Sequence, residues 1–430
     1  MDTMIRKLKD HLKDNKVLIK DNFILFVSFF ILNFLGYLFH FYAGRKLGPE
    51  DYGVFGSLLS LIYIIGLPLT SIQTTITKFV ADFKVKNQLG EISYLLRSSL
   101  KKMFIIGIGI TIIYLLLSPL IASFLKIDNL TPVMVISSYL LIALLLPITR
   151  GIIQGLQRFT QLGISFILEG ITKLGLGVLL ISIGMGVSGA ILAFTFAYVF
   201  PFILTLYFLK NIFTKEKRKF DSEKIYKYSF PVAVMLVSLT GFFTIDILLV
   251  KHFLSAVEAG YYAAITLLGK VIFFGSMSVS LVMFPKIAEL YAIKKDTRKL
   301  MLKSLFMVFL FSFVVTVLYF LFPGFVVNIL FGSEYLEIAN LIGLFGLFMS
   351  IFSLVYVLSF YNISIQRSKF IYILVLFNIV EGGLIYLFHD SLIQIINILI
   401  WLIILLFLVL VIYTYLDKNE RMDINNTRLQ

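Results

Sequence analysis

Residues 395–413 read IINILIWLIILLFLVLVIY, an almost continuously apolar stretch near the end of the chain. A run of about 20 apolar residues can cross a hydrocarbon core of about 30 Å as an α-helix. A transmembrane β-barrel would instead show segments of about ten residues in which apolar and polar residues alternate. We therefore expect membrane-spanning α-helices, because a helix satisfies its own backbone hydrogen bonds within lipid.

The whole chain has the composition of a membrane protein. Of its 430 residues, 59% are hydrophobic and 14% are charged, and the mean hydropathy is +0.97. Soluble domains are about 45–50% apolar and about 25% charged. The pattern predicts an all-α polytopic membrane protein with twelve transmembrane helices, at residues 23–43, 55–81, 103–124, 133–155, 163–184, 187–210, 229–251, 259–284, 303–323, 337–361, 370–388 and 392–415. The first is too long for a signal peptide and no cleavage site follows it, so we expect it to be retained.

The basic residues indicate how the chain is oriented. Cytoplasmic loops of membrane proteins are enriched in lysine and arginine. If the N-terminus is cytoplasmic, 32 of the 38 lysines and arginines fall on the cytoplasmic side. Four lie in outer loops, namely Arg45, Lys46, Lys126 and Lys251, and two lie within helices, namely Lys173 and Lys270. All others are then cytoplasmic, so we expect a multi-pass protein of the cell membrane with both termini inside. The net charge of +14 comes from basic residues in short loops next to the membrane, where anionic lipids attract them. Nucleic acid is therefore not an expected partner.

A polar linker divides the chain into two halves with similar landmarks. The expected divisions are a basic N-tail at 1–22, a six-helix lobe at 23–210, a basic linker at 211–228, a second six-helix lobe at 229–415 and a C-tail at 416–430, with tails and linker cytoplasmic. The landmarks Leu47, Asp51, Gly53 and Phe55 recur at one constant offset as Leu254, Glu258, Gly260 and Tyr262. Six helices per half predict parallel repeats related by a pseudo-two-fold axis along the membrane normal.

No feature of the sequence indicates covalent chemistry. Cysteine is absent, the four histidines lack metal-ligand spacing, and no loop is large enough for a catalytic domain. Residues 184–189 read GMGVSG and match the dinucleotide-binding pattern, but no strand precedes them. We expect no enzyme activity, no catalytic residue, no metal site and no cofactor, and a protein that moves a substrate across the bilayer.

Charged residues within the predicted helices are the candidate functional residues. Each costs about 2.5–3.5 kcal/mol at the bilayer centre and so is expected to face the bundle interior. Glu169 and Lys173 can pair along one helix, whereas Asp246 and Lys270 could pair between two helices. Glu381 has no evident partner. These residues either pair for structural reasons or line the substrate pathway.

The pathway interpretation gives the candidate residues separate roles. Lys173 and Lys270 would bind a phosphate-bearing substrate, and Asp246, Glu169 or Glu381 would bind a coupling ion, H⁺ or Na⁺. Asn33 could line the same cavity or could serve helix packing.

The segment around Gly48 has a structural and a functional interpretation. Gly48 can end one helix and Pro49 can begin the next. Arg45 is not needed for this capping, and at the outer mouth of a cavity it could attract an anionic head group. Both interpretations stay open.

Four segments carry a resemblance to a known family. They are RKLGPEDYGVF at 45–55, GIIQGLQRF at 151–159, GVSGAILA at 186–193 and FPKIAELY at 284–291. Together they resemble polysaccharide exporters, the O-antigen flippases, within the multidrug/oligosaccharidyl-lipid/polysaccharide exporter superfamily. The resemblance implies two six-helix bundles around a central cavity, and a polyprenyl-linked oligosaccharide that alternating access moves from the inner to the outer leaflet.

The same resemblance assigns the residues of the cavity. It maps the family's cationic cavity onto Arg45, Lys173 and Lys270. The two additional helices of lipid II flippases are missing here, which favours the twelve-helix sugar exporters. Two alternatives stay open: a cation-coupled multidrug exporter of the same fold, which should have an acid-rich cavity, and a non-transporting membrane scaffold of a glycan-assembly complex.

Overall fold

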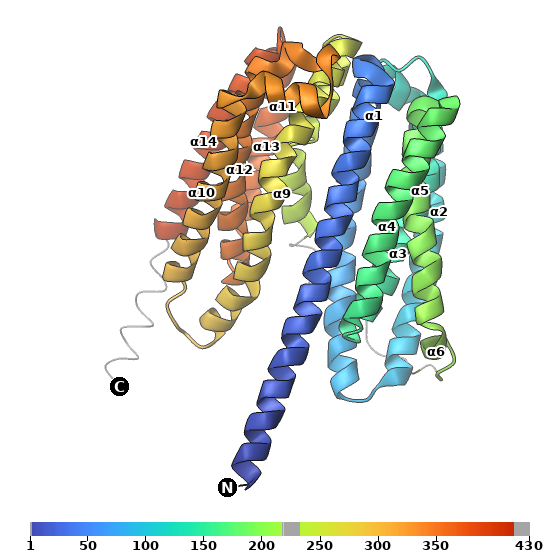
Figure 1. The fold of residues 1–430 in the computed structure, drawn as a ribbon, viewed down its shortest axis with the longest axis vertical. Helices are drawn as coiled ribbons and strands as arrows, with labels where there is room; N and C mark the ends of the chain where they lie inside the picture. Colours follow the sequence, from blue (N-terminus) through green and yellow to red (C-terminus); the bar gives the residue numbers. More distant parts are fainter. Residues whose placement is uncertain (1, 217, 219–232, 417–430) are drawn as a thin grey trace. The chain divides into compact units, whose positions relative to one another are not determined.

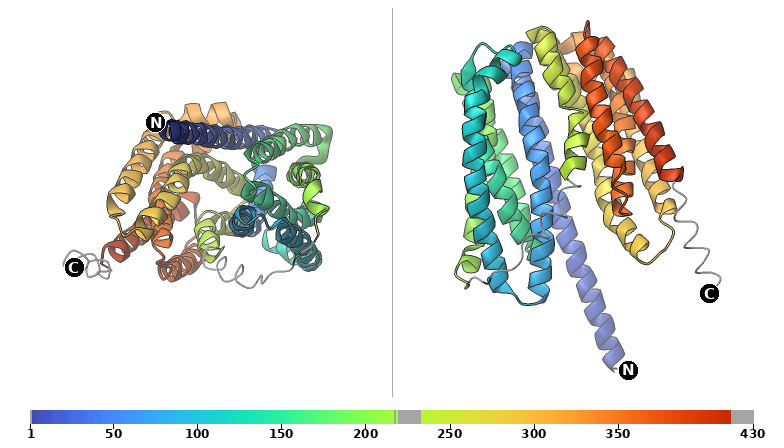
Figure 2. Two further views of the ribbon diagram at one scale, coloured as in Figure 1. Left: turned by 90° about the horizontal axis from the view of Figure 1, so that it is seen from below. Right: turned by 180° about the vertical axis from the view of Figure 1, so that it is seen from behind.

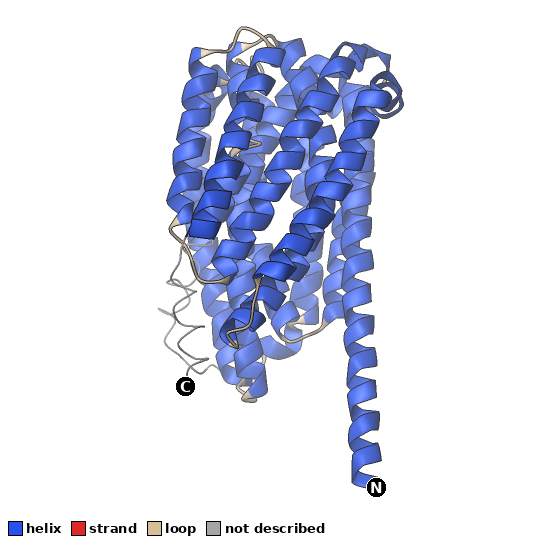
Figure 3. Ribbon diagram, turned by 90° about the vertical axis from the view of Figure 1, so that its left-hand side faces the viewer, coloured by secondary structure: helices blue, strands red, loops and turns tan. Residues whose placement is uncertain are grey.

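The computed structural model describes residues 2–216, 218 and 233–416, and every secondary-structure element in this part of the chain is helical (Figure 3). In chain order (Figure 1), the elements are α1 (Asp2–Val85), α2 (Leu89–Phe124), α3 (Leu130–Gly155), α4 (Phe159–Leu180), the π-helix η1 (Ile181–Met185), α5 (Gly186–Phe208), α6 (Lys210–Phe213), α8 (Ile245–Phe253), α9 (Ala256–Ala292), α10 (Arg298–Leu321), α11 (Pro323–Leu330), the 3₁₀-helix η2 (Ser333–Ile338), α12 (Ala339–Ser364), α13 (Phe370–Leu387) and α14 (Leu392–Leu416). Residues 233–241 are helical as well.

The described residues contain ten helical spans that are long and apolar enough to cross a membrane. This number is smaller than the twelve predicted helices because two continuous stretches each hold two of them. The predicted helices 23–43 and 55–81 both lie in α1, and 163–184 and 187–210 both lie in the span Phe159–Phe208. The short elements α11 and η2, between α10 and α12, had no counterpart among the predicted helices.

Glycines break both of the long stretches. In α1, Gly48 has φ 71° and ψ 173°, which are not helical, so the predicted helix end at Gly48 is confirmed. In the second stretch, Gly184 has φ 90° and Gly186 has φ 51°. A residue with a side chain rarely adopts a positive φ without strain, so glycine suits these positions.

Large apolar side chains are exposed on the helix surfaces. On α10 alone they include Leu302, Phe306, Met307, Phe309, Leu310, Phe313 and Phe320. A soluble monomer rarely exposes an apolar surface of this extent, whereas lipid solvates it without cost. The protein is therefore a multi-pass membrane protein, in agreement with its hydropathy.

The chain forms two compact units: a first unit of Met1–Leu47 and Ile65–Phe230, and a second unit of Gly48–Ile64 and Pro231–Gln430. The predicted linker at 211–228 falls largely outside the described residues. In the first unit, α3 packs against α2, α4 and α5, and Figure 2 shows these helices from two directions. In the second unit, α12 packs against α9, α10 and α14, and α13 packs against α8 and α14.

Two of the repeated landmark residues meet inside the second unit. A Cβ atom on Gly53 would lie 2.6 Å from the backbone nitrogen of Gly260, and a Cβ atom on Gly260 would overlap the backbone oxygen of Pro49. The segment 48–64 therefore crosses α9 at backbone contact. Close crossings of this kind require small residues at the interface of membrane helices.

Candidate functional site

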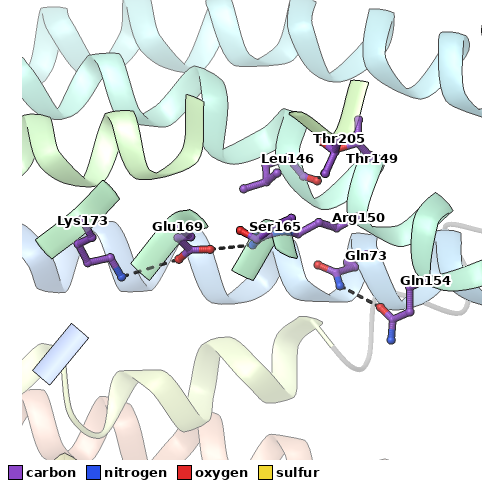
Figure 4. A network of polar contacts seen from close by, with 9 residues as sticks. All are labelled: Gln73, Leu146, Thr149, Arg150, Gln154, Ser165, Glu169, Lys173 and Thr205. Atoms are coloured by element: carbon purple, nitrogen blue, oxygen red, sulfur yellow. Dashed lines mark hydrogen bonds and ion pairs between the residues drawn. The ribbon is translucent and has the colours of Figure 1, made fainter. Parts of the chain in front are cut away.

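The first unit buries a chain of charged side chains on α3 and α4. Arg150 Nη1 lies 2.8 Å from Glu169 Oε2, and Lys173 Nζ lies 3.7 Å from Glu169 Oε1 (Figure 4). The side chains of Arg150 and Glu169 are each 7% exposed, and that of Lys173 is 13% exposed. We call Arg150, Glu169 and Lys173 the first-unit charge cluster. The predicted pairing of Glu169 with Lys173 is confirmed, although Arg150 makes the shorter contact.

Arg150 is held by more than its ion pair. Its Nε donates to Ser165 Oγ at 2.8 Å and its Nη2 donates to the Ser165 carbonyl at 3.0 Å. The guanidinium also lies 4.5 Å from the centre of the Phe166 ring. Such planar, multiply bonded contacts suit arginine rather than lysine at a buried position.

Arg150 is the residue that the sequence analysis missed. It was counted among the cytoplasmic basic residues, but it is 6% exposed and lies within α3. Its position could have been recognised from the sequence, because Arg150 lies inside the predicted helix 133–155 and the next predicted helix carries Glu169 and Lys173, with which it could pair.

Two cations share one carboxylate in this cluster. Lys173 makes a further contact, because its Nζ lies 4.8 Å from the centre of the Phe194 ring on α5. An aromatic ring stabilises a cation without neutralising it. With Arg150 and Lys173 both protonated and Glu169 ionised, the cluster keeps one uncompensated positive charge, which an anion could neutralise.

The second unit buries a different group around Asp246. Asp246 is fully buried in the first turn of α8, after a break in the helix at residues 242–244. Its Oδ2 accepts a hydrogen bond from the hydroxyl of Tyr262 at 2.7 Å, and its Oδ1 accepts one from the backbone N–H of Ile247 at 2.7 Å. These bonds compensate for part of the lost hydration of the carboxylate.

Lys270 on α9 does not form the direct ion pair with Asp246 that the sequence had allowed. Within the described residues, no contact of 4.0 Å or less joins the two charges. The Lys270 Nζ instead lies 4.9 Å from the ring centre of Tyr63 and 5.1 Å from that of Phe243. The side chain is 5% exposed, so this ammonium group is buried among aromatic rings and acts on Asp246 only at longer range.

Glu381 on α13 is the least satisfied of the candidate residues. It is fully buried, and neither of its carboxylate oxygens has a hydrogen-bond partner in the described part of the chain. Its carboxyl group lies within electrostatic range of Asp246 in the same unit. The two carboxylates and Lys270 form what we call the second-unit charge cluster.

The remaining predicted residues, Asn33 and Arg45, lie on α1. Asn33 donates its amide to the carbonyl of Phe29 at 2.7 Å on its own helix, and Arg45 is exposed one turn before Gly48. Lys251 was expected in an outer loop but is 3% exposed in the last turn of α8.

Comparison with solved structures identifies the fold. A multidrug resistance MATE family transporter of the MOP superfamily, solved in an inward-facing conformation, matches with a TM-score of 0.75 and 16% identity over 92% of this chain and 95% of the other. A MOP superfamily transporter from Pyrococcus furiosus, described as having a binding pocket of reverse polarity, matches with a TM-score of 0.59 and 17% identity over 94% and 96% of the two chains. The fold is that of MOP superfamily transporters.

Comparison of sequences identifies the family within this fold. The model of the polysaccharide biosynthesis protein family matches residues 18–291. An uncharacterized membrane protein of Methanocaldococcus jannaschii is 25% identical over 298 residues, which cover 63% of this chain and 68% of the relative. The chain belongs to the polysaccharide biosynthesis protein family.

Proposed function

We propose that the protein is a flippase that moves a polyprenyl-linked oligosaccharide from the inner to the outer leaflet of the cell membrane. Its family is named for polysaccharide biosynthesis, and its fold is that of MOP superfamily transporters. In this proposal the units alternate the access of the substrate site between the two sides of the membrane, driven by H⁺ or Na⁺. The oligosaccharide crosses with its phosphate or pyrophosphate group, and the prenyl chain stays in lipid.

The first-unit charge cluster carries this proposal. Arg150 and Lys173 share Glu169 at 2.8 Å and 3.7 Å, which leaves one positive charge without a counter-charge. A cation at the bilayer centre costs about 2.5–3.5 kcal/mol on the mildest scale. An anionic head group would offset this cost through charge-assisted hydrogen bonds, and arginine is well suited to phosphate. Lys270, which forms no ion pair within 4.0 Å in the described residues, and the exposed Arg45 are proposed as further head-group contacts.

The proposed topology retains all twelve helices. Each kinked stretch then crosses the membrane twice, the lobes are 23–210 and 229–415, and a pseudo-two-fold axis along the membrane normal relates them. Both termini, the linker at 211–228 and the two tails are cytoplasmic. The excess of lysine and arginine on that side supports this orientation.

A cation-coupled multidrug exporter is the second candidate function. It is favoured by the second-unit charge cluster, in which two buried carboxylates accompany one lysine and neither oxygen of Glu381 has a hydrogen-bond partner among the described residues. A cationic drug could neutralise such a group. The two functions therefore differ in the charge of the substrate that they require.

Translocation in proteoliposomes tests the proposal. A fluorescent polyprenyl-pyrophosphate oligosaccharide is placed in both leaflets, and quenching from outside reports its exchange between leaflets under imposed H⁺ and Na⁺ gradients. Wild type should accelerate exchange over empty liposomes, and Lys173→Gln and Lys270→Gln should each slow it at least about tenfold. Tyr386→Phe, an exposed position on α13, is the matched control and should translocate as wild type does.

Two results would contradict the flippase proposal. Failure of wild type to translocate several such lipids, with export of a cationic dye, would replace the flippase by the drug exporter. A protein that moves neither substrate would be the scaffold.

A further inference from the structure

The helices α13 and α14 of the second unit leave a groove open between them. The two helices lie side by side (Figure 2), and the groove has a volume of about 670 Å³, within the range of about 300–1,000 Å³ that is usual for small-molecule sites. Its apolar walls include Leu376, Phe377, Leu384, Ile398 and Leu405. Leu376 and Leu405 are more than half exposed, so the groove is open to the surrounding lipid.

The groove has about the length of one lipid leaflet. It runs along α14 from Ile393 to Leu405, which is about 18 Å for a helix that rises 1.5 Å per residue. A hydrocarbon core of about 30 Å gives each leaflet about 15 Å. The groove begins next to the loop 388–391, which lies on the outer side in the proposed topology. One chain of an outer-leaflet lipid therefore matches its length.

Two amide side chains line the end of the groove that is nearest to this loop. They are Gln394 and Asn397, three residues apart on one face of α14. Gln394 Oε1 accepts a hydrogen bond from the Asp390 backbone N–H at 2.8 Å, which leaves the Gln394 Nε2 to donate. Asn397 is exposed and makes no hydrogen bond with the described residues. An unpaired amide is costly in hydrocarbon, so both side chains call for a ligand that supplies acceptor oxygens.

The segment that forms this polar end is acidic rather than basic. Asp390, whose backbone is bonded to Gln394, is exposed in the loop before α14. Residues 370–397, which comprise α13, the loop and the start of α14, contain no lysine or arginine. An anionic head group would meet the Asp390 carboxylate and no basic residue of this segment, whereas an ammonium group could pair with that carboxylate.

We propose that the groove between α13 and α14 binds one zwitterionic phospholipid with a head-group amine, of the phosphatidylethanolamine type. An acyl chain fills the apolar part, lipid oxygens accept hydrogen bonds from Gln394 and Asn397, and the ammonium group pairs with Asp390. A second copy of the chain fits less well, because a two-fold contact would set the same concave groove against itself and leave it unfilled. The site adds a lipid ligand that the proposed function does not require.

Trp401 makes this site directly measurable. It lines the groove, is 72% exposed and is the only tryptophan of the chain, so tryptophan fluorescence reports on the groove alone. The purified, delipidated full-length protein is titrated in detergent micelles with phosphatidylethanolamine that carries bromine on its acyl chains. Quenching by wild type should saturate at one lipid per protein, and phosphatidylglycerol with the same chains should need an at least about tenfold higher mole fraction.

Three variants separate the parts of the site. Asn397→Leu should raise the mole fraction for half-quenching at least about fivefold, because it removes a hydrogen-bond donor. Asp390→Asn keeps the backbone bond to Gln394 and should abolish the preference for phosphatidylethanolamine over phosphatidylglycerol. Ile412→Ala, an exposed position of α14 beyond the groove, is the matched control and should behave as wild type does.

Three results would overturn the site. Quenching that rises with lipid mole fraction without saturating, equally in wild type and Asn397→Leu, would mean that Trp401 meets only bulk lipid. Equal half-quenching by the two wild-type head groups would remove the role of Asp390. Protection of Trp401 from quenching in a protein that is dimeric by native mass spectrometry would assign the groove to a second copy.

Discussion

Replacing Glu169 with glutamine should destabilise the first unit by about 3 kcal/mol. The change removes the carboxylate that contacts both Arg150 and Lys173, which lie 2.8 Å and 3.7 Å from it. Breaking a buried ion pair by removing one partner typically costs 3–5 kcal/mol, because the other charge is left buried. We expect the lower end of this range, since Arg150 keeps its hydrogen bonds to Ser165 and its contact with the Phe166 ring.

The assay is reversible unfolding by denaturant in mixed micelles, followed by circular dichroism. The double variant Arg150→Met, Glu169→Leu is the decisive comparison, because it removes the closer ion pair as a unit and leaves one buried cation, Lys173, where Glu169→Gln leaves two. It should therefore cost less than Glu169→Gln alone. A cost below about 1 kcal/mol for Glu169→Gln, or a double variant at least as destabilised as the single one, would refute the argument that charge pairing holds this cluster.

Three further predictions concern single contacts. Gly260→Ala should lower the thermal midpoint in detergent by several degrees, because its Cβ would overlap a backbone oxygen, whereas Gly383→Ala, whose Cβ would meet nothing within 4 Å, should not lower it. Tyr262→Phe removes the donor to Asp246 Oδ2 at 2.7 Å and should cost about 1–3 kcal/mol in denaturant unfolding; no change would mean that another donor replaces it. Lys173→Gln should keep wild-type stability to within about 1 kcal/mol while losing translocation, because Glu169 keeps its closer partner Arg150 and the glutamine can still donate a hydrogen bond; a parallel loss of both would make Lys173 a structural partner.

Hydropathy was sufficient to predict the helices because the bilayer constrains them directly. The predicted segments 370–388 and 392–415 differ from α13 and α14 by one residue. The ends of α2 and α9 were less accurate, since both helices continue into polar sequence beyond the predicted membrane segments, from Leu89 and to Ala292. The thickness of the hydrocarbon core sets the length of the apolar segment, but the helix can extend beyond the membrane.

Side-chain partners were harder to predict than helices. The pairing of Glu169 with Lys173 follows from their spacing on one helix, and the structure confirms it. The contact with Arg150 depends on how α3 and α4 are rotated against each other, which hydropathy does not encode. The same limitation applies to Asp246 and Lys270, where Tyr262 and two aromatic rings take the places expected of the charged partners.

The break at 242–244 also had no clear signal in the sequence. The region has no proline, and Gly241 alone does not distinguish a break from a close helix contact. Its acceptor-rich surroundings depend on Asn378 and Glu381, far away in the sequence.

Translocation of two matched lipids by the wild-type protein tests the proposed flippase function most directly. One is a prenyl-pyrophosphate oligosaccharide, and the other carries the same chain and sugars through a neutral ether linkage. We expect the pyrophosphate lipid to be translocated at least about tenfold faster, because buried cations bind its head group. Equal rates for both lipids, or faster movement of a cationic drug than of either, would contradict it.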